Sequence, residues 1–170
     1  MYSFPLDHRI ECSGFLFREK PKKRRIKKGV IGKDISPLKI IALKDGKDVL
    51  DDNGEVLMEN IKYTTDPAPS FSYAFCSDTK YSEAILPYIK KVDLLYHEAT
   101  FMEDMKDRAE ATHHTTTKQA GEIAKKANVG QLLIGHFSTR YKELAPMLEE
   151  TKSVFENTKL AIEGEVFNVE

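Results

Sequence analysis

Three apolar runs in this 170-residue chain each lead to a side chain that can bind a metal ion or transfer a proton. Each run has the length of a β-strand, and the segments between them have helical periodicity. This pattern predicts an α/β fold in the order strand, helix, strand, helix, strand. In open α/β sheets, ligands bind just beyond the carboxyl ends of the strands. We therefore expect one reactive edge, formed by the residues at or after the ends of these runs: Asp78, Glu98 and His136.

A fourth candidate, His114, stands before the helix that the apolar spacing predicts over 120–127. Thr116 and Gln119 fit a capping box at the start of this helix, and Asn128 fits its end. The N–H groups of a helix N-terminus favour an anion, so we interpret residues 114–117 as a candidate phosphate site.

The remaining elements are less regular. Between residues 20 and 70, prolines and glycines recur, and Asp52-Asn53-Gly54 indicates a turn between two short β-prone stretches. A segment of this length without a clear pattern is usually functional or mobile, which predicts an arm or insertion carrying a small hairpin. Elsewhere we expect strands over 4–10, 12–17, 160–162 and 165–169, and helices over 82–91, 101–111 and 141–155.

Length and composition predict a single globular domain, because 170 residues with 41% hydrophobic content can bury one core of ordinary size. No apolar run approaches the roughly 20 residues of a membrane span, and the first residues lack the pattern of a signal peptide. We therefore expect a cytoplasmic protein without a membrane segment. Cys12 and Cys76 both lie in apolar runs, which favours two reduced thiols over a disulfide.

The net charge of −1 conceals a basic run over 18–28, in which eight Lys or Arg residues stand against one acid. Dense basic runs are often only solvated surface. The alternative is contact with a phosphate backbone, for which Arg24 and Arg25 at the centre of the run are the candidates.

A metal site is one of two interpretations of the strand-end residues. His8, Asp78 and His136 offer the nitrogen and oxygen ligands that suit zinc or manganese. They come from distant points of the chain and lack close His-x-His spacing, so the residues alone also fit ordinary polar strand ends.

Five segments together resemble the successive motifs of ribonuclease Z, the tRNA 3′-processing endonuclease of the metallo-β-lactamase superfamily. They occur in order and cover nearly the whole chain: Phe4-Pro-Leu-Asp-His8-Arg-Ile, Cys76-Ser-Asp78-Thr, Leu-Leu-Tyr-His97-Glu98-Ala-Thr, His114-Thr-Thr-Thr-Lys-Gln-Ala and Ile-Gly-His136-Phe-Ser-Thr-Arg140-Tyr. Members of this family carry a tRNA-binding arm between the motifs that match His8 and Asp78, where this chain has its basic run.

The resemblance implies a role for each matched residue. His8 would bind one zinc ion, Asp78 would bridge two, and His136 would bind the second. His114 would act on the scissile phosphate or the leaving oxygen, Glu98 would orient it, and Arg140 would contact phosphate. Two metal ions in such a site stabilise the attacking and leaving oxygens of an in-line displacement. The implied reaction is removal of the 3′ trailer from tRNA precursors.

One departure from the family is expected to matter. The His-x-His-x-Asp-His motif that supplies most metal ligands in ribonuclease Z does not occur in this sequence. The chain therefore resembles the C-terminal half of the metallo-β-lactamase αββα sandwich, with the arm at about 20–70. We expect it to be inactive alone and to pair with an N-terminal half or a second copy.

Two other functions are compatible with the sequence. The chain could be a non-catalytic module that binds tRNA or dimerises, for which the basic arm would suffice. It could also be another hydrolase of the same superfamily that acts on a small ester, although the basic arm and the His114-Thr-Thr segment argue against this.

Overall fold

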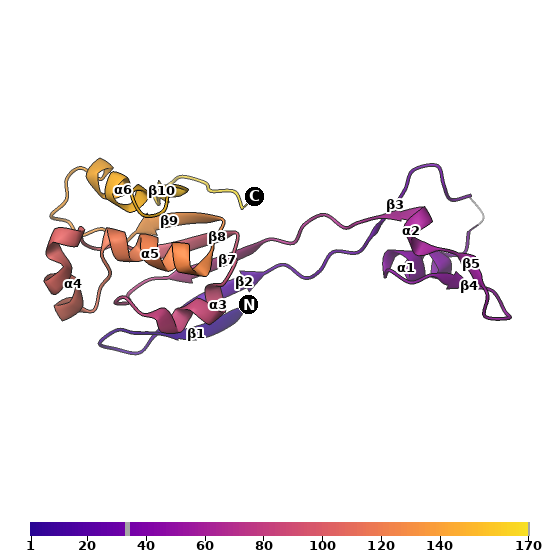
Figure 1. The fold of residues 1–170 in the computed structure, drawn as a ribbon, viewed down its shortest axis with the longest axis horizontal. Coiled ribbons are helices and arrows are strands. Elements are labelled where there is room, and N and C mark those ends of the chain that lie inside the picture. The colour runs from indigo at the N-terminus through magenta and orange to yellow at the C-terminus, as the bar shows by residue number, and fades with distance from the viewer. Residues whose placement is uncertain (33–34, 170) are drawn as a thin grey trace. The chain divides into compact units, whose positions relative to one another are not determined.

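The computed structural model describes residues 1–32 and 35–169, which form two compact units (Figure 1). The first unit comprises Met1–Glu19 and Phe71–Glu170, and the second comprises Lys20–Ser70. The second unit thus spans the interval predicted as an arm.

The first unit is built on a sheet of six described strands in the order β1-β2-β7-β8-β9-β10. The first three strands are antiparallel, and β7 to β10 are parallel, so the reactive residues after β7, β8 and β9 meet at one edge. This confirms the predicted α/β order. The strands are β1 (Tyr2–Leu6), β2 (Cys12–Arg18), β7 (Ser72–Cys76), β8 (Leu94–Glu98), β9 (Gln131–Gly135) and β10 (Thr158–Leu160).

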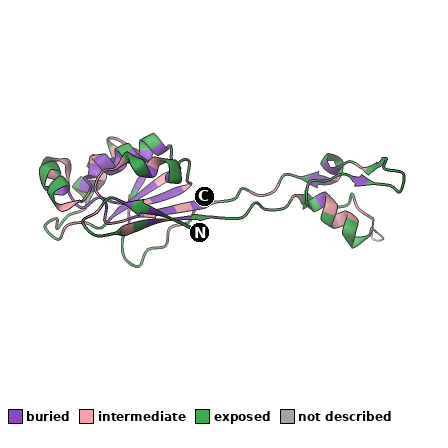
Figure 2. Cartoon of the chain, turned by 90° about the horizontal axis from the view of Figure 1, so that it is seen from below, coloured by how far each residue is buried: buried purple, intermediate pink, exposed green. Residues whose placement is uncertain are grey.

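The helices of the first unit connect the parallel strands, as parallel pairing requires. They are α3 (Leu86–Ile89), α4 (Lys106–Thr112), α5 (Thr117–Ala127) and α6 (Ala145–Lys152), with the 3₁₀ turns η1 (Glu83–Ile85) and η2 (Glu103–Met105). The core lies between one face of the sheet and the helices α3 and α5 (Figures 1 and 2), where Ala74, Leu95 and Leu132 pack with Ile89 and Ile123.

The helix α5 forms as predicted. The Thr116 side chain accepts from the Gln119 N–H, the Gln119 side chain accepts from the Thr116 N–H, and Asn128 ends the helix in the left-handed conformation. The interpretation of residues 114–117 as a phosphate site is wrong, because the N–H of Thr115 donates to Glu98 and that of Thr117 to the Phe101 carbonyl. These threonines are fully buried, so an anion from solvent does not reach their N–H groups.

Several expected elements differ from the structure. The strand expected over 4–10 ends at Leu6, the strand expected over 160–162 is β10, and the helix expected over 101–111 begins as η2 and continues as α4. The helices expected over 82–91 and 141–155 are shorter in the structure, where they are α3 and α6. Both observed helices have a proline in their first turn, the place where the N–H that proline lacks is not needed for a helical hydrogen bond. Residues 165–169 form no strand. Val166 there is 87% exposed, and β-prone residues need a neighbouring strand to pair with.

The second unit holds α1 (Pro37–Lys44), α2 (Asn60–Tyr63) and the two-stranded pairs β3 (Arg25–Ile26) with β6 (Thr64–Thr65) and β4 (Val49–Leu50) with β5 (Val56–Met58). The pair β4–β5 is the hairpin predicted around Asp52–Gly54, and Gly54 adopts the positive φ that its turn requires. Buried Asn60 joins the unit by donating to the Leu43 and Lys47 carbonyls.

The sheet face opposite α3 and α5 carries a row of aromatic side chains. Phe15, Phe75 and Tyr96 are register partners across β2, β7 and β8, and the Phe75 and Tyr96 rings stack with centroids 4.7 Å apart. On the next row Phe17 stacks on Tyr73, and Phe17 is 43% exposed. All five side chains are at most partly buried, as expected for a face that a second layer would cover.

Two further expectations concern the thiols and the membrane. Cys12 and Cys76 are both free, as predicted. Within the described residues, none of the helices has the length and apolar character needed to cross a bilayer.

Buried His97 makes a testable contribution to stability. Its Nδ1 donates to the Glu98 carbonyl, and burial lowers the pKa of its ring. The unfolded chain takes up this proton below about pH 6.5, so the free energy of unfolding should fall on acidification below that pH, by up to about 1.4 kcal/mol per pH unit. Urea denaturation between about pH 5 and pH 7 should show a steeper fall for the wild type than for His97→Leu. Equal slopes would contradict this account.

Candidate metal and acid-base site

Four of the predicted residues meet at the carboxyl edge of the parallel strands. Glu98 ends β8, Asp78 follows β7, His136 follows β9, and His114 lies between α4 and α5. Each contributes a potential ligand atom, and these atoms lie within 4.8 Å of one another. The structure thus brings together residues that are up to 58 positions apart, at the edge that the strand pattern indicated.

The backbone is unusual at the two exposed members. Asp78 has φ 59° and His136 has φ 58°, a left-handed conformation that non-glycine residues rarely adopt. Such residues cost about 1–3 kcal/mol each and persist only where the surrounding structure holds them. The left-handed turns at these two residues bring their side chains together, so that His136 Nε2 lies 3.3 Å from Asp78 Oδ1.

Glu98 is the buried anion of the site. Its carboxylate, fully shielded from solvent, accepts from the Thr79 N–H, the Thr115 N–H, the Thr100 hydroxyl and His114 Nδ1 at 2.7–3.1 Å. Burial alone would raise its pKa, but the hydrogen bonds from His114, Thr100 and Thr115 hold the pKa below the ordinary value. Glu98 is therefore ionised, and its acceptor positions are already filled, so it is not a good metal ligand.

His114 is oriented by this carboxylate. Its Nδ1 lies 2.9 Å from Glu98 Oε1, and this hydrogen bond raises the pKa of the imidazole. The ring sits between two other histidines, with its centroid 5.2 Å from that of His136 and 5.3 Å from that of His8. Because Nδ1 is engaged, Nε2 is the nitrogen available to act on a substrate.

Asp78 and His136 are the pair best suited to hold a metal ion. Their side chains are 45% and 41% exposed, so the pair is open to solvent on one side. Zinc binds histidine nitrogen and carboxylate oxygen at about 2.0–2.2 Å, and two such ligands of a tetrahedral ion lie about 3.4 Å apart. The observed 3.3 Å separation fits that requirement.

His8 lies beside this group but is not one of the four clustered residues. It follows β1, and its Nδ1 donates to the His113 carbonyl at 2.9 Å. His113 ends α4 in the left-handed conformation, with φ 60°. Since a carbonyl can only accept, the His8 proton is on Nδ1, and Nε2 carries the free lone pair that a metal ligand needs.

The three arginines lie in different surroundings. Arg140 packs on Phe101, with its guanidinium carbon 5.4 Å from the ring centroid, and Phe101 contacts the His114 ring. Arg24 belongs to the second unit, where it pairs with Asp66 at 2.6 Å and donates to Thr64, so its guanidinium helps to hold that unit together. Arg25 in β3 is exposed.

Sequence reasoning missed the threonine that connects these groups. The Thr100 hydroxyl contacts both Glu98 and His136, and Thr100 is only 6% exposed. A signal was present, because Thr100 follows Glu98 by two residues at the end of a strand. No pattern of spacing shows that its partner would be His136, which is 36 residues away.

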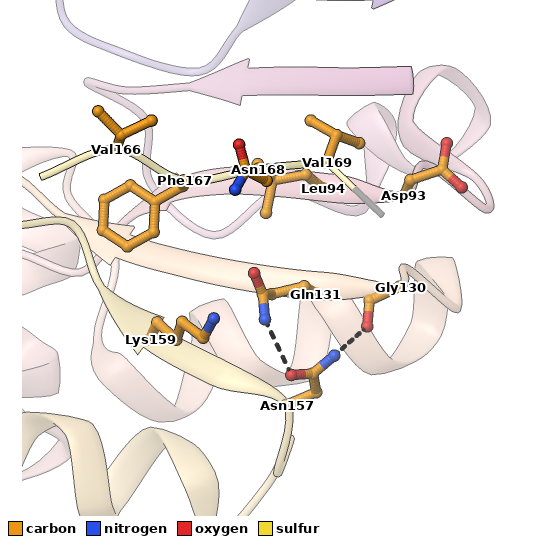
Figure 3. A pocket seen from close by; sticks show the side chains of 10 residues that line it. All are labelled: Asp93, Leu94, Gly130, Gln131, Asn157, Lys159, Val166, Phe167, Asn168 and Val169. Carbon is orange, nitrogen blue, oxygen red and sulfur yellow. Dashed lines mark hydrogen bonds between the residues drawn. The ribbon is translucent and has the colours of Figure 1, made fainter. Parts of the chain in front are cut away.

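A pocket of about 270 Å³ lies elsewhere, at the amino ends of β8 and β9 (Figure 3). Asp93, Gln131 and Lys159 line it, and Asn157 bridges Gln131 and the Gly130 carbonyl. Because Glu98 and His136 stand at the opposite ends of these strands, this pocket is not part of the site.

The Glu98–His114 pair can be tested directly. Glu98→Gln removes the charge that raises the pKa of His114, so this pKa should fall toward its ordinary value of about 6.5. An NMR titration of the imidazole measures it. Glu110→Gln makes the same change on α4, where Glu110 pairs with Lys80, and should leave the His114 titration unchanged. If the two variants titrate alike, Glu98 does not control His114.

Comparison with known proteins supports the resemblance. No protein-family model matches the chain. The chain is 50% identical over 169 residues to ribonuclease Z of Cytophaga hutchinsonii, which is 99% of this chain and 54% of that protein. It is 44% identical over 165 residues to ribonuclease Z of Parabacteroides distasonis, covering 96% of this chain and 54% of the relative.

Two solved structures share the fold at 19% sequence identity. The metallo-β-lactamase fold protein YhfI from Bacillus subtilis matches with a TM-score of 0.61 over 98% of this chain and 48% of its own. Human tRNase Z, short form, matches with a TM-score of 0.53 over 99% of this chain and 42% of its own. The chain spans about half the length of the curated relatives it matches. Over nearly all of its length it is therefore a relative of ribonuclease Z with part of a metallo-β-lactamase fold, and corresponds to about half of that protein.

Proposed function

We propose that this chain supplies half of a zinc-dependent endoribonuclease that removes the 3′ trailer from tRNA precursors in the cytoplasm. The observation that carries this proposal is the meeting of Asp78, Glu98, His114 and His136 at one sheet edge. These residues lie in the segments that resemble ribonuclease Z, and the relatives of that name match 96–99% of the chain.

In this proposal His8, Asp78 and His136 would hold the zinc ions. When bound, the ions would supply Lewis-acid stabilisation of the phosphoryl oxygens during the displacement. His136 and His8 each have a ring nitrogen free for this purpose, and Asp78 has an exposed carboxylate.

His114 supplies the proton for the leaving 3′ oxygen. Glu98 favours the protonated imidazole, and Nε2 is the ring nitrogen that Glu98 does not engage, so its proton is the one available for transfer. Departure of an alkoxide from a phosphodiester is assisted by such a donor. Arg140, held on Phe101 next to His114, provides a positive charge for the substrate phosphates.

The site needs further ligands from outside these residues. Three ligands shared between two ions leave most coordination positions open, whereas zinc sites usually have four ligands. The aromatic face formed by Phe15, Phe75 and Tyr96 is a surface on which a second layer can pack. We therefore propose that the other half of the enzyme covers this face, with a homodimer as the competing arrangement.

A non-catalytic tRNA-binding module is the second candidate function. It is favoured by the separate compact unit over Lys20–Ser70, which carries most of the basic run. A small-ester hydrolase explains neither this unit nor the Glu98–His114 pair beside the proposed metal ligands. Cleavage of a tRNA precursor separates the nuclease from the module, and binding of tRNA separates both from the ester hydrolase.

Completion of the site by the missing half can be tested by reconstitution. Alone, the chain should bind zinc weakly or at one position and should not cleave a tRNA precursor. Adding the half of Cytophaga hutchinsonii ribonuclease Z that this chain does not match should restore both activities. Phe75→Asp on the aromatic face should block the rescue, whereas Leu50→Asp, at a 53% exposed position of the second unit, should not. Tight binding of two zinc ions by the isolated chain, measured by elemental analysis after dialysis, would refute the half-site proposal.

In the reconstituted enzyme, two substitutions should separate metal binding from acid catalysis. Asp78→Ala should remove both zinc and activity, because it removes the carboxylate that would hold the metal ions beside His136. His114→Ala should keep the zinc and slow cleavage by about 10²- to 10⁴-fold, the usual contribution of a positioned acid. Zinc content and cleavage rate are measured on the same samples. Loss of zinc in His114→Ala would show that His114 is a ligand.

The basic run should contribute to RNA affinity through phosphates. Arg25→Glu is the cleaner test, because Arg24→Glu also breaks the pair with Asp66. Each lost phosphate contact should weaken tRNA binding and reduce the log–log salt slope by about 0.7, the value for single strands. Lys90→Glu reverses an exposed charge at the end of α3 and serves as the control. If Arg25→Glu and Lys90→Glu bind alike at every salt concentration, Arg25 does not contact RNA.

A further inference from the structure

The Thr100 hydroxyl occupies the centre of the site without an assigned role. It lies 2.7 Å from Glu98 Oε2, 2.9 Å from His136 Nδ1 and 3.0 Å from the His136 carbonyl oxygen. Thr100 is 6% exposed, so water has little access to these contacts. The arrangement joins the acid-base pair to the proposed metal ligand through one oxygen atom.

The hydrogen-bonding capacity of these groups determines where the protons are. A hydroxyl has one proton to donate and lone pairs that can accept. The Glu98 carboxylate and the His136 carbonyl can only accept, and the short 2.7 Å contact favours Glu98 as the acceptor of the hydroxyl proton. The remaining neighbour, His136 Nδ1, must then donate to the hydroxyl.

The opposite tautomer is disfavoured by the same contacts. If His136 carried its proton on Nε2, Nδ1 would need the hydroxyl proton. The Thr100 oxygen would then face the Glu98 carboxylate at 2.7 Å with no proton between them. Two buried acceptors in contact without a proton between them are unfavourable, because the hydrogen bond that would compensate for the lost water is missing.

We propose that Thr100 is a positioning residue that fixes the His136 proton on Nδ1 and so leaves Nε2 as a bare nitrogen for the metal ion. The inference rests on the proposed function in treating His136 as a metal ligand. It goes further by naming the residue that prepares this ligand and by linking it to Glu98. Outer groups that orient a metal-binding histidine typically change metal affinity by 10- to 100-fold when they are lost.

The surroundings of Nε2 show what each tautomer means for a metal ion. Nε2 lies 3.3 Å from Asp78 Oδ1 on the solvent-open side. A proton on Nε2 would be donated to this carboxylate and would leave no lone pair for a metal ion. With the proton on Nδ1, the Nε2 lone pair and the Asp78 oxygen can share one cation. In the metal-free chain the contact with Thr100 therefore competes with the contact with Asp78 in setting the tautomer.

The first experiment uses the metal-free chain and needs no substrate. Long-range proton–nitrogen NMR on the ¹⁵N-labelled chain, at a pH where the imidazole is neutral, shows which ring nitrogen carries the proton. The His136 signals are assigned by their loss in His136→Gln. The proposal expects the proton on Nδ1 in the wild type, and a proton on Nε2 would overturn it even if every Thr100 variant failed to fold.

The second experiment changes the hydroxyl. Thr100→Val keeps the shape of the side chain, and should move the proton to Nε2 and weaken zinc binding by about 10- to 100-fold in competition with a chromogenic chelator. Thr100→Ser restores the hydroxyl and should behave as the wild type. Thr151→Val removes another buried hydroxyl, bonded to the Met147 carbonyl within α6, and should change neither reading. A folded Thr100→Val chain with unchanged tautomer and zinc affinity would overturn the proposal.

These readings are independent of RNA cleavage. If the tautomer and the zinc affinity respond to Thr100 as expected but the reconstituted protein cleaves no tRNA precursor, the proposed function fails and the role of Thr100 stands. If cleavage is found while Thr100→Val keeps the wild-type tautomer and zinc affinity, the proposed function stands and the role of Thr100 fails.

Discussion

The buried carboxylate of Glu98 is the interaction on which the rest of the site depends. Burying an ionised carboxylate is costly unless hydrogen bonds compensate for the lost water. Its compensating donors come from three separate segments: the loop after β7 through Thr79, the loop after β8 through Thr100, and the segment before α5 through His114 and Thr115. The charge of Glu98 therefore holds these three segments together.

The four clustered residues differ in how far their polar atoms are already hydrogen-bonded. The Glu98 carboxylate has oxygen atoms that could coordinate a metal ion, yet these oxygens already accept hydrogen bonds from protein groups. Asp78 and His136 lack such a set of partners and face solvent. Proximity alone would make all four residues metal ligands, whereas their hydrogen bonds separate the Glu98–His114 pair from Asp78 and His136, which remain open to an ion.

Sequence reasoning predicted the parts of the fold that depend on local pattern. The strands that precede Asp78, Glu98 and His136, the capping box of α5 and the hairpin at Gly54 all follow from periodicity or turn chemistry. The lack of a strand over 165–169 depends on which neighbours are present to pair, and residue types alone do not carry that information.

The chemistry of the site was predictable only in part for the same reason. Residue types and the resemblance indicated His8, Asp78, Glu98, His114 and His136. The bond between Thr100 and His136, and the bonds that occupy the N–H groups of Thr115 and Thr117, are tertiary contacts. A local rule placed a phosphate at the start of α5, but Glu98 and the Phe101 carbonyl already accept from these N–H groups.

The most direct test of this account is the anomalous scattering of zinc in crystals of the chain. The account predicts zinc within about 2.0–2.2 Å of His136 Nε2 and of an Asp78 oxygen. Glu98 should keep its hydrogen bonds to Thr79, Thr100, His114 and Thr115. Zinc bonded to a Glu98 oxygen, with His114 turned away from the carboxylate, would contradict the central claim.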